Sequence, residues 1–171
     1  MKPTIKPVNG YLAFILVFLL IGLNACGFQL RGTNLQGLQN ASIFVQSSNA
    51  NVLAAEVKRQ LLDAGISPVS IASDADYIVI LSNESFGRKV TAVSPSTGKV
   101  EEYEVTYTAM LKITGPDKSS IASTKPVSAS RDYTFDEGAV LGTFSQESVL
   151  KKDIAKQVAA TVLRQLRAVI Q

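Results

Sequence analysis

The stretch EYEVTYTAMLKIT, residues 102–114, alternates between apolar and polar side chains along its length, with Met110 as the one exception. Successive side chains of a β-strand point to opposite faces of the sheet. The pattern therefore predicts a strand with one face on a core and the other in a polar environment. The predicted core-facing residues are Tyr103, Val105, Tyr107, Ala109, Leu111 and Ile113.

Two shorter β-prone stretches precede this strand in the sequence. The first is Ile43–Val45, and the second is Tyr77–Leu81, whose unbroken apolar character predicts a central position in the sheet. After Leu81 the chain turns polar over residues 82–89 and becomes apolar again at Val90. The second strand therefore has two apolar parts that a polar segment separates.

Turn residues separate the last two strands from their neighbours. Ser94–Gly98 contains serines, a proline and a glycine, which predicts the tip of a hairpin before the strand quoted above. A fourth strand is predicted through Ile121 to Phe135, and Pro126 within it favours an edge or a bulge because proline cannot donate a ladder hydrogen bond.

Two segments have the periodicity of helices. Asn49 and Asn51 are candidate N-caps for a helix that extends to about Ala64, and Gly65 can take the left-handed position that ends it. A longer helix is predicted after Thr143–Gln146, which fits a capping box. Apolar residues recur every four positions along it, namely Leu150, Ile154, Val158, Val162, Leu166 and Ile170.

The predicted order of elements is therefore β-α-β-β-β-α. A parallel crossover through the first helix, followed by a meander, gives an α+β two-layer sandwich. In it, a four-stranded, mostly antiparallel sheet carries both helices on one face.

The composition argues against an enzyme. The 171 residues include no histidine, which removes mechanisms that need an imidazole near neutral pH, and the single cysteine rules out an internal disulfide or a cysteine-cluster metal site. Acidic groups such as Glu101, Glu102 and Glu104 are expected to be solvated rather than catalytic, so no catalytic residue, metal site or cofactor is predicted.

The N-terminus has the layout of a secretory signal. Lys2 and Lys6 precede the apolar run Tyr11–Leu23, which is shorter than the roughly 20 residues that a transmembrane helix needs. Cleavage before Cys26 would also remove these two lysines, so the formal net charge of +3 is no argument for nucleic-acid binding.

Leu23-Asn24-Ala25-Cys26 resembles a bacterial lipobox. This resemblance implies that the Cys26 thiol takes a diacylglycerol and that its freed amine can take a further acyl chain such as palmitate. Two or three chains anchor a protein firmly where one is marginal. Gly27 stands where an inner-membrane lipoprotein typically has aspartate, which points to the outer membrane. The alternatives are a cleaved signal that leaves a free thiol and an uncleaved anchor.

The sequence after this cysteine is more specific. Cys26–Gly32 reads CGFQLRG and is similar to the start of the mature chain in the LptE (RlpB) family of lipopolysaccharide-assembly lipoproteins. The resemblance, with the element order, implies a cleaved signal peptide at 1–25, a lipidated tether at 26–40 and a single α+β domain at 41–171. It also implies a non-enzymatic plug in the LptD outer-membrane β-barrel that faces the periplasm and binds lipopolysaccharide.

Basic residues at the predicted hairpin are the candidates for lipopolysaccharide contact. Arg88, Lys89 and Lys99 flank the tip, and Lys89 and Lys99 are expected to lie close together on adjacent strands. Lysine and arginine suit the phosphates of lipid A because charge-assisted hydrogen bonds to phosphate are strong. The alternative is that these cations only protect an exposed strand against aggregation.

Two other functions stay open at this stage. The chain could be a pilotin-like or other adaptor lipoprotein for a different envelope barrel, which would need the same anchor and the same small domain. A periplasmic hydrolase with lysine or carboxylate catalysis is the third possibility, and the lack of any convergent site opposes it.

Overall fold

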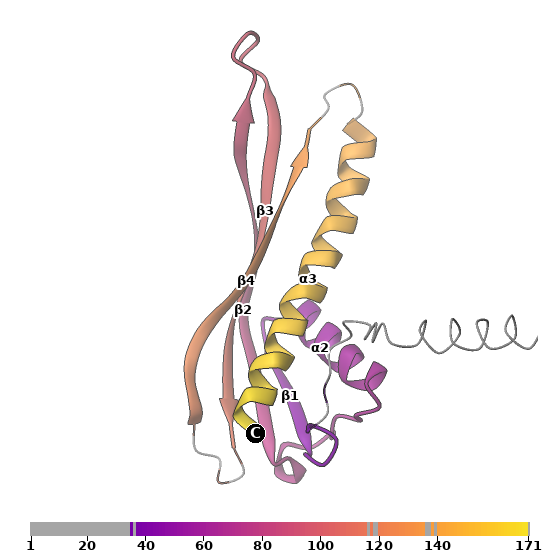
Figure 1. Cartoon of the computed structure of the whole chain (residues 1–171), viewed down its shortest axis with the longest axis vertical. Helices are drawn as coiled ribbons and strands as arrows, with labels where there is room; N and C mark the ends of the chain where they lie inside the picture. Colours follow the sequence, from indigo (N-terminus) through magenta and orange to yellow (C-terminus); the bar gives the residue numbers. More distant parts are fainter. Residues whose placement is uncertain are drawn as a thin grey trace, which may run out of the picture. The chain divides into compact units, whose positions relative to one another are not determined.

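The strand predicted at residues 102–114 lies inside a four-stranded sheet in the computed structural model of the chain (Figure 1). The strands follow the sequence order β1-β2-β3-β4 across the sheet. The structure describes residues 35, 37–115, 117, 120–135, 138 and 140–170. The predicted signal peptide, Cys26 and the CGFQLRG motif lie outside the described residues. The strands are β1 (Ile43–Ser48), β2 (Tyr77–Val93), β3 (Val100–Thr114) and β4 (Ser120–Thr134).

The sheet is mixed rather than mostly antiparallel. β1 and β2 pair in parallel, with Ile43 opposite Tyr77, because the predicted crossover helix between them returns the chain in the same direction. β2 pairs with β3 and β3 pairs with β4 in antiparallel fashion. The edge position predicted for the proline-containing fourth strand is confirmed, since β4 is last in the order.

The second strand continues through its polar segment. β2 runs from Tyr77 to Val93, and its polar residues stay in register with β3, as in the pair Arg88–Val105. Pairing of this kind uses backbone groups and does not require apolar side chains. Only a bulge between Ser82 and Ser85 marks the polar segment, and Asn83 there has a φ of 54°.

The first helix, α2 (Asn51–Asp63), lacks the asparagine cap that the sequence predicted. Ala50 occupies the N-cap position, and Asn49 instead takes a φ of 58° just before the helix. The carboxylate of Glu84, from the bulged part of β2, accepts the backbone N–H of Val52 at 3.1 Å. The prediction for the other end is confirmed, because Gly65 has a φ of 77°.

The second helix, α3 (Val140–Ile170), begins three residues before the predicted capping box. Thr143 and Gln146 are therefore inside the helix, and the predicted cap is wrong. The predicted apolar stripe is confirmed along its middle, where Ile154, Val158 and Val162 are fully buried. A short 3₁₀ turn, η1 (Ala72–Asp74), completes the described elements.

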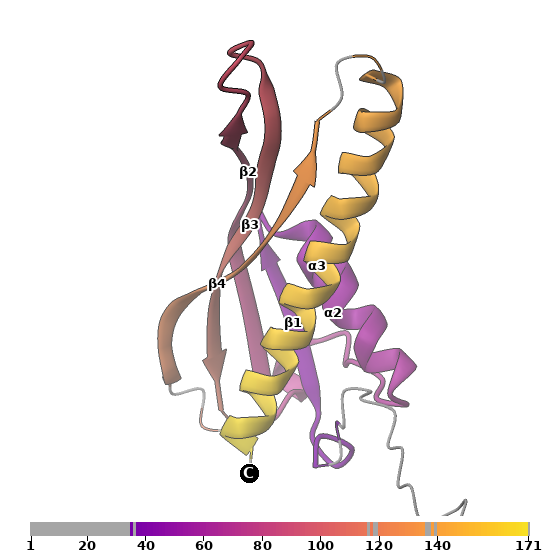
Figure 2. The same ribbon diagram turned by 45° about the horizontal axis from the view of Figure 1, so that its top comes forward.

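Both helices lie on the same face of the sheet, as Figures 1 and 2 show. The core forms between them and the inner face of the sheet, where Val105, Tyr107, Ala109, Leu111 and Ile113 of β3 are buried. No described helix covers the opposite face. The first half of α3 and the hairpin end of β2 and β3 both extend beyond α2 and β1 (Figure 2). All of these elements belong to one compact unit, Leu35–Gln171.

Within the part of the chain that the structure describes, no helix is both long enough and apolar enough to cross a membrane.

Two adjacent leucines of α2 test the position of the core. Leu61 is fully buried, whereas 57% of Leu62 is exposed. We expect Leu61→Ala to lower the free energy of unfolding by about 2–5 kcal/mol, because it leaves a cavity in the core. Leu62→Ala, the same chemical change one residue later, should alter it by less than about 0.5 kcal/mol. Urea unfolding followed by circular dichroism measures both, and equal losses would contradict this packing.

Candidate functional site

A network of charged and aromatic side chains joins α3 to the sheet near the hairpin end, with Glu147 at its centre. One Glu147 oxygen lies 3.2 Å from a guanidinium nitrogen of Arg88 on β2 and accepts the Tyr133 hydroxyl of β4 at 3.0 Å. The other oxygen lies 2.8 Å from the Lys151 ammonium, one helical turn further along α3. Side chains from β2, β4 and α3 therefore meet at one carboxylate.

The sheet register explains why these side chains meet. Arg88 lies opposite Val105 on the face that the helices cover, and Tyr103 lies opposite both Val90 and Tyr133 in the neighbouring strands. The guanidinium carbon of Arg88 is 4.6 Å from the centre of the Tyr103 ring. A cation over an aromatic face is attracted by the ring's quadrupole. The strands therefore position Arg88 between an aromatic ring and a carboxylate.

Charge stabilises the ionised form of Glu147. The hydrogen bond from Lys151 is the main reason that the pKa of Glu147 lies below its ordinary value of 4.5. Burial opposes this shift, while the hydroxyl of Tyr133 and the charge of Arg88 add to it. Burial also raises the pKa of Tyr133, so its hydroxyl keeps its proton and donates to Glu147.

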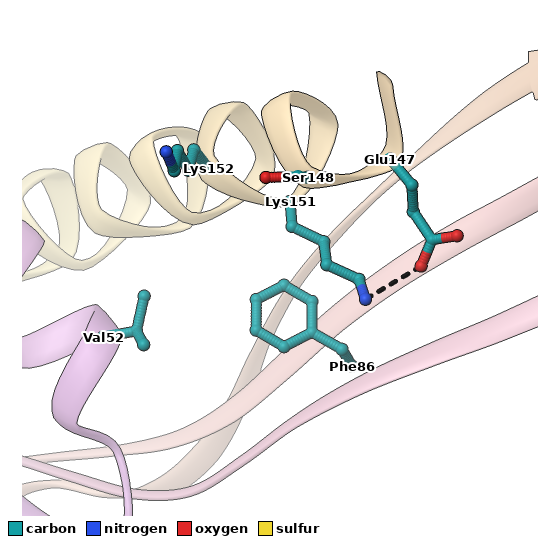
Figure 3. Close-up of a pocket in the computed structure, with 6 residues that line it drawn as sticks. All are labelled: Val52, Phe86, Glu147, Ser148, Lys151 and Lys152. Atoms are coloured by element: carbon teal, nitrogen blue, oxygen red, sulfur yellow. Dashed lines mark ion pairs between the residues drawn. The ribbon is translucent and has the colours of Figure 1, made fainter. Parts of the chain in front are cut away.

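A cavity of about 400 Å³ opens beside this network, and we call it the Phe86 pocket. Figure 3 shows the Phe86 ring between Val52 of α2 and the side chain of Lys151. The Lys151 ammonium lies 5.7 Å from the centre of that ring, and the same ring packs 4.5 Å from that of Tyr107. The pocket is lined by Val52, Phe86, Glu147, Ser148, Lys151 and Lys152.

The three basic residues predicted at the hairpin do not form one cluster. Arg88 and Lys89 are consecutive in β2 and therefore point to opposite faces of the sheet. The cross-strand partner of Lys89 is Glu104, whereas Lys99 lies beyond Val93–Val100, the last pair of the hairpin. The expectation that Lys89 and Lys99 lie close on adjacent strands is therefore not met, because the register places Lys99 further toward the tip.

Sequence reasoning missed Phe86 and Glu147 as members of a site. The spacing of Glu147 and Lys151, four residues apart in a helical pattern, could have indicated their ion pair. No local signal pointed to Arg88 or Tyr133 as further partners, because these contacts depend on how α3 packs on the sheet.

This arrangement is suited to binding a ligand. The described residues contain no group of histidine, cysteine and carboxylate side chains that could hold a metal ion. The cations at the site surround aromatic and aliphatic carbon, and such surroundings suit a ligand with an anionic group attached to an apolar part.

The lowered pKa of Glu147 predicts a pH-dependent contribution to stability. Because its pKa is lower in the folded protein than in the unfolded chain, the stabilisation is complete above the ordinary carboxyl pKa and is lost as pH falls through the lowered value. Glu147→Gln should therefore be less stable than the wild type at pH 7, by about 1 kcal/mol since Arg88 and Lys151 are nearly half exposed.

This difference should begin to narrow as the pH falls below the ordinary carboxyl pKa, and it should close once the pH is below the lowered pKa of Glu147, where the wild-type carboxylate is also neutralised. Thermal unfolding between pH 3 and pH 8 measures it. Asp153→Asn is the matched control, because Asp153 forms an exposed pair with Lys156 on the same helix. A difference between Glu147→Gln and the wild type that stays constant with pH would contradict the assigned role of the charge.

Comparison with known proteins places the fold in a family. The model of the LptE family, described as lipopolysaccharide-assembly, matches residues 40–166. No curated protein matches the chain. The fold is similar to that of rare lipoprotein B from Shewanella oneidensis, with a TM-score of 0.65 and 23% identity over 74% of this chain and 94% of that one.

Two further solved structures have the same architecture. Lipoprotein B from Nitrosomonas europaea gives a TM-score of 0.67 at 21% identity and covers 83% of this chain and 91% of its own. A minor lipoprotein from Acinetobacter baumannii gives 0.60 at 22% identity, over 75% and 91%. The family match spans every strand, α2 and most of α3. The chain therefore belongs to the LptE family of lipopolysaccharide-assembly lipoproteins.

Proposed function

We propose that this protein is an outer-membrane lipoprotein that occupies the LptD β-barrel as a plug, binds lipopolysaccharide and assists its assembly at the cell surface. Family membership supports a non-enzymatic role in lipopolysaccharide assembly within the cell envelope. Three parts of the proposal go beyond family membership: the barrel partner, the outer-membrane location and the acylation of Cys26. The lipobox at residues 23–26 supports the anchor.

The observation that best supports a plug is that the helices cover only one face of the sheet. The helices cover one face, and the opposite face carries threonine, serine and acidic residues along β3 and β4. The Ser85 and Thr108 hydroxyls of this face are hydrogen-bonded at 2.7 Å. The lumen of an outer-membrane barrel is polar, so a face of this kind can pack inside it without burying unpaired apolar surface.

For lipopolysaccharide, the cations of the hairpin offer contacts on both faces. Lys89 is exposed on the uncovered face, Lys99 is exposed next to the tip, and Arg88 lies on the helix side. Arg88 is held by Glu147, so its guanidinium is already oriented when a phosphate approaches. Phosphate groups distributed over a glycolipid can be met by cations that are spread along the hairpin.

The first test is capture of the partner. Tagged, lipidated protein is purified from detergent-solubilised envelopes, and the proteins that accompany it are identified and quantified. We expect LptD in a ratio near one to one, because one plug occupies one barrel. Recovery of the protein alone, or with a secretin or another assembly machine, would overturn the proposed partner and favour an adaptor for a different barrel.

A second test addresses the hairpin cations. Replacing both Lys89 and Lys99 with alanine should weaken lipopolysaccharide binding several-fold, because two charge-assisted contacts are removed from exposed positions. The control is the double change of Lys58 and Lys125 to alanine, which removes the same charge from exposed positions on α2 and β4. Binding is measured with immobilised lipopolysaccharide. Equal affinities of the two double variants would remove Lys89 and Lys99 from the binding site.

A further inference from the structure

The Phe86 pocket continues into a second pocket of about 510 Å³ between the two helices. The two pockets share Val52 and Lys152, so they form a continuous groove that we call the interhelical groove. α2 and α3 lie side by side in Figures 1 and 2. The exposed side chain of Val52 lines both pockets. The second pocket is lined by Asn51, Val52, Ala55, Glu56, Arg59, Lys152, Ala155 and Lys156.

The floor of the interhelical groove is apolar and reaches solvent. Val52 is 53% exposed and Phe86 is 37% exposed, although both are residue types that are usually buried. Ala55 and Ala155 form the next part of the floor, and their small side chains leave room between the helices. Neither the helices nor the sheet covers this apolar surface. Binding of an apolar ligand there would be favoured by about 0.8 kcal/mol for each CH₂ group that it buries.

The rim of the groove carries an excess of positive charge. Among the lining residues, the cations are Arg59, Lys151, Lys152 and Lys156, and the carboxylates are Glu56 and Glu147. Arg59 pairs with Glu56, Lys151 with Glu147, and Lys156 with Asp153 just outside the lining. Lys152 makes no ion pair with any residue that the structure describes, and it lies where the two pockets meet.

We propose that the interhelical groove binds one acyl chain of lipopolysaccharide, with an anionic group of the lipid held at Lys152. This assignment rests on the proposed function, and it adds a place for the hydrocarbon part of the ligand that the hairpin cations do not supply. An apolar floor beside Lys152, which pairs with none of the described residues, matches an acyl chain carried by a phosphate-bearing sugar. Two other occupants of the groove are less favoured. The positive rim repels the chain's own residues 27–31, which include Arg31, and it does not attract the uncharged diacylglycerol of the anchor.

Photo-crosslinking in living cells tests the groove in the full, lipidated protein. A benzophenone amino acid is placed at Val52, and at Leu62 as the matched control, because both positions are on α2 and both are about half exposed. After irradiation, adducts are detected with an antibody against lipopolysaccharide. We expect an adduct from position 52 and none from position 62. An adduct from neither position, equal adducts from both, or an adduct only with protein at position 52 would overturn the proposal.

Two second-site changes, each made in the protein with the cross-linker at position 52, separate the parts of the groove. Ala55→Trp fills the floor from an exposed position without entering the core, and it should abolish the lipopolysaccharide adduct. Lys152→Glu should lower the adduct about fivefold, the ratio that corresponds to about 1 kcal/mol. An unchanged adduct in both variants would overturn the assignment.

Capture of LptD is measured in the same cells. If LptD is captured but position 52 gives no lipopolysaccharide adduct, the groove assignment fails and the proposed function stands. If LptD is not captured, the proposed plug fails, whatever the result at position 52.

Discussion

One-sided burial of the sheet is the constraint on which the rest of this structure depends. The alternating residues of β3 and the four-residue apolar stripe of α3 each supply a single apolar face, and each face can be removed from water only by packing on the other. α2 adds Leu53, Val57 and Leu61 to the same layer. Because both helices pack on one face, the other face of the sheet must tolerate a polar environment.

The same packing brings the functional candidates together. α3 is longer than α2, so its first turns extend along the sheet toward the hairpin, where no second helix covers them (Figure 1). There Glu147 substitutes for apolar packing by holding Arg88, Tyr133 and Lys151. Val52, at the N-terminal end of α2, and Phe86 of β2 are exposed beside this region. The interhelical groove begins there.

These features give a coherent picture of a lipopolysaccharide-assembly lipoprotein. Family membership identifies the process as lipopolysaccharide assembly. The proposed plug gives a role to the polar face of the sheet, which the helices leave uncovered. In the proposed function, the hairpin cations contact phosphate groups of the glycolipid and the interhelical groove holds one of its acyl chains. The β-bulge at Ser82–Ser85 links the two regions, because it places Glu84 at the start of α2 and is followed by Phe86 and Arg88 in β2.

The sequence by itself determined the order of elements, the core faces of β3 and α3, and the glycine at the end of α2, because periodicity and local backbone preference are properties of neighbouring residues. It limited β4 to an edge or a bulge, and the structure places β4 at the edge. It also carried the CGFQLRG motif that pointed to the family. Only the tertiary structure decided the cap of α2, which comes from Glu84 in another element, the continuity of β2, which β3 enforces through backbone pairing, and the start of α3 at Val140. It likewise decided that Arg88 meets Glu147 while Lys89 points away, because register and helix packing fix which side chains share a face.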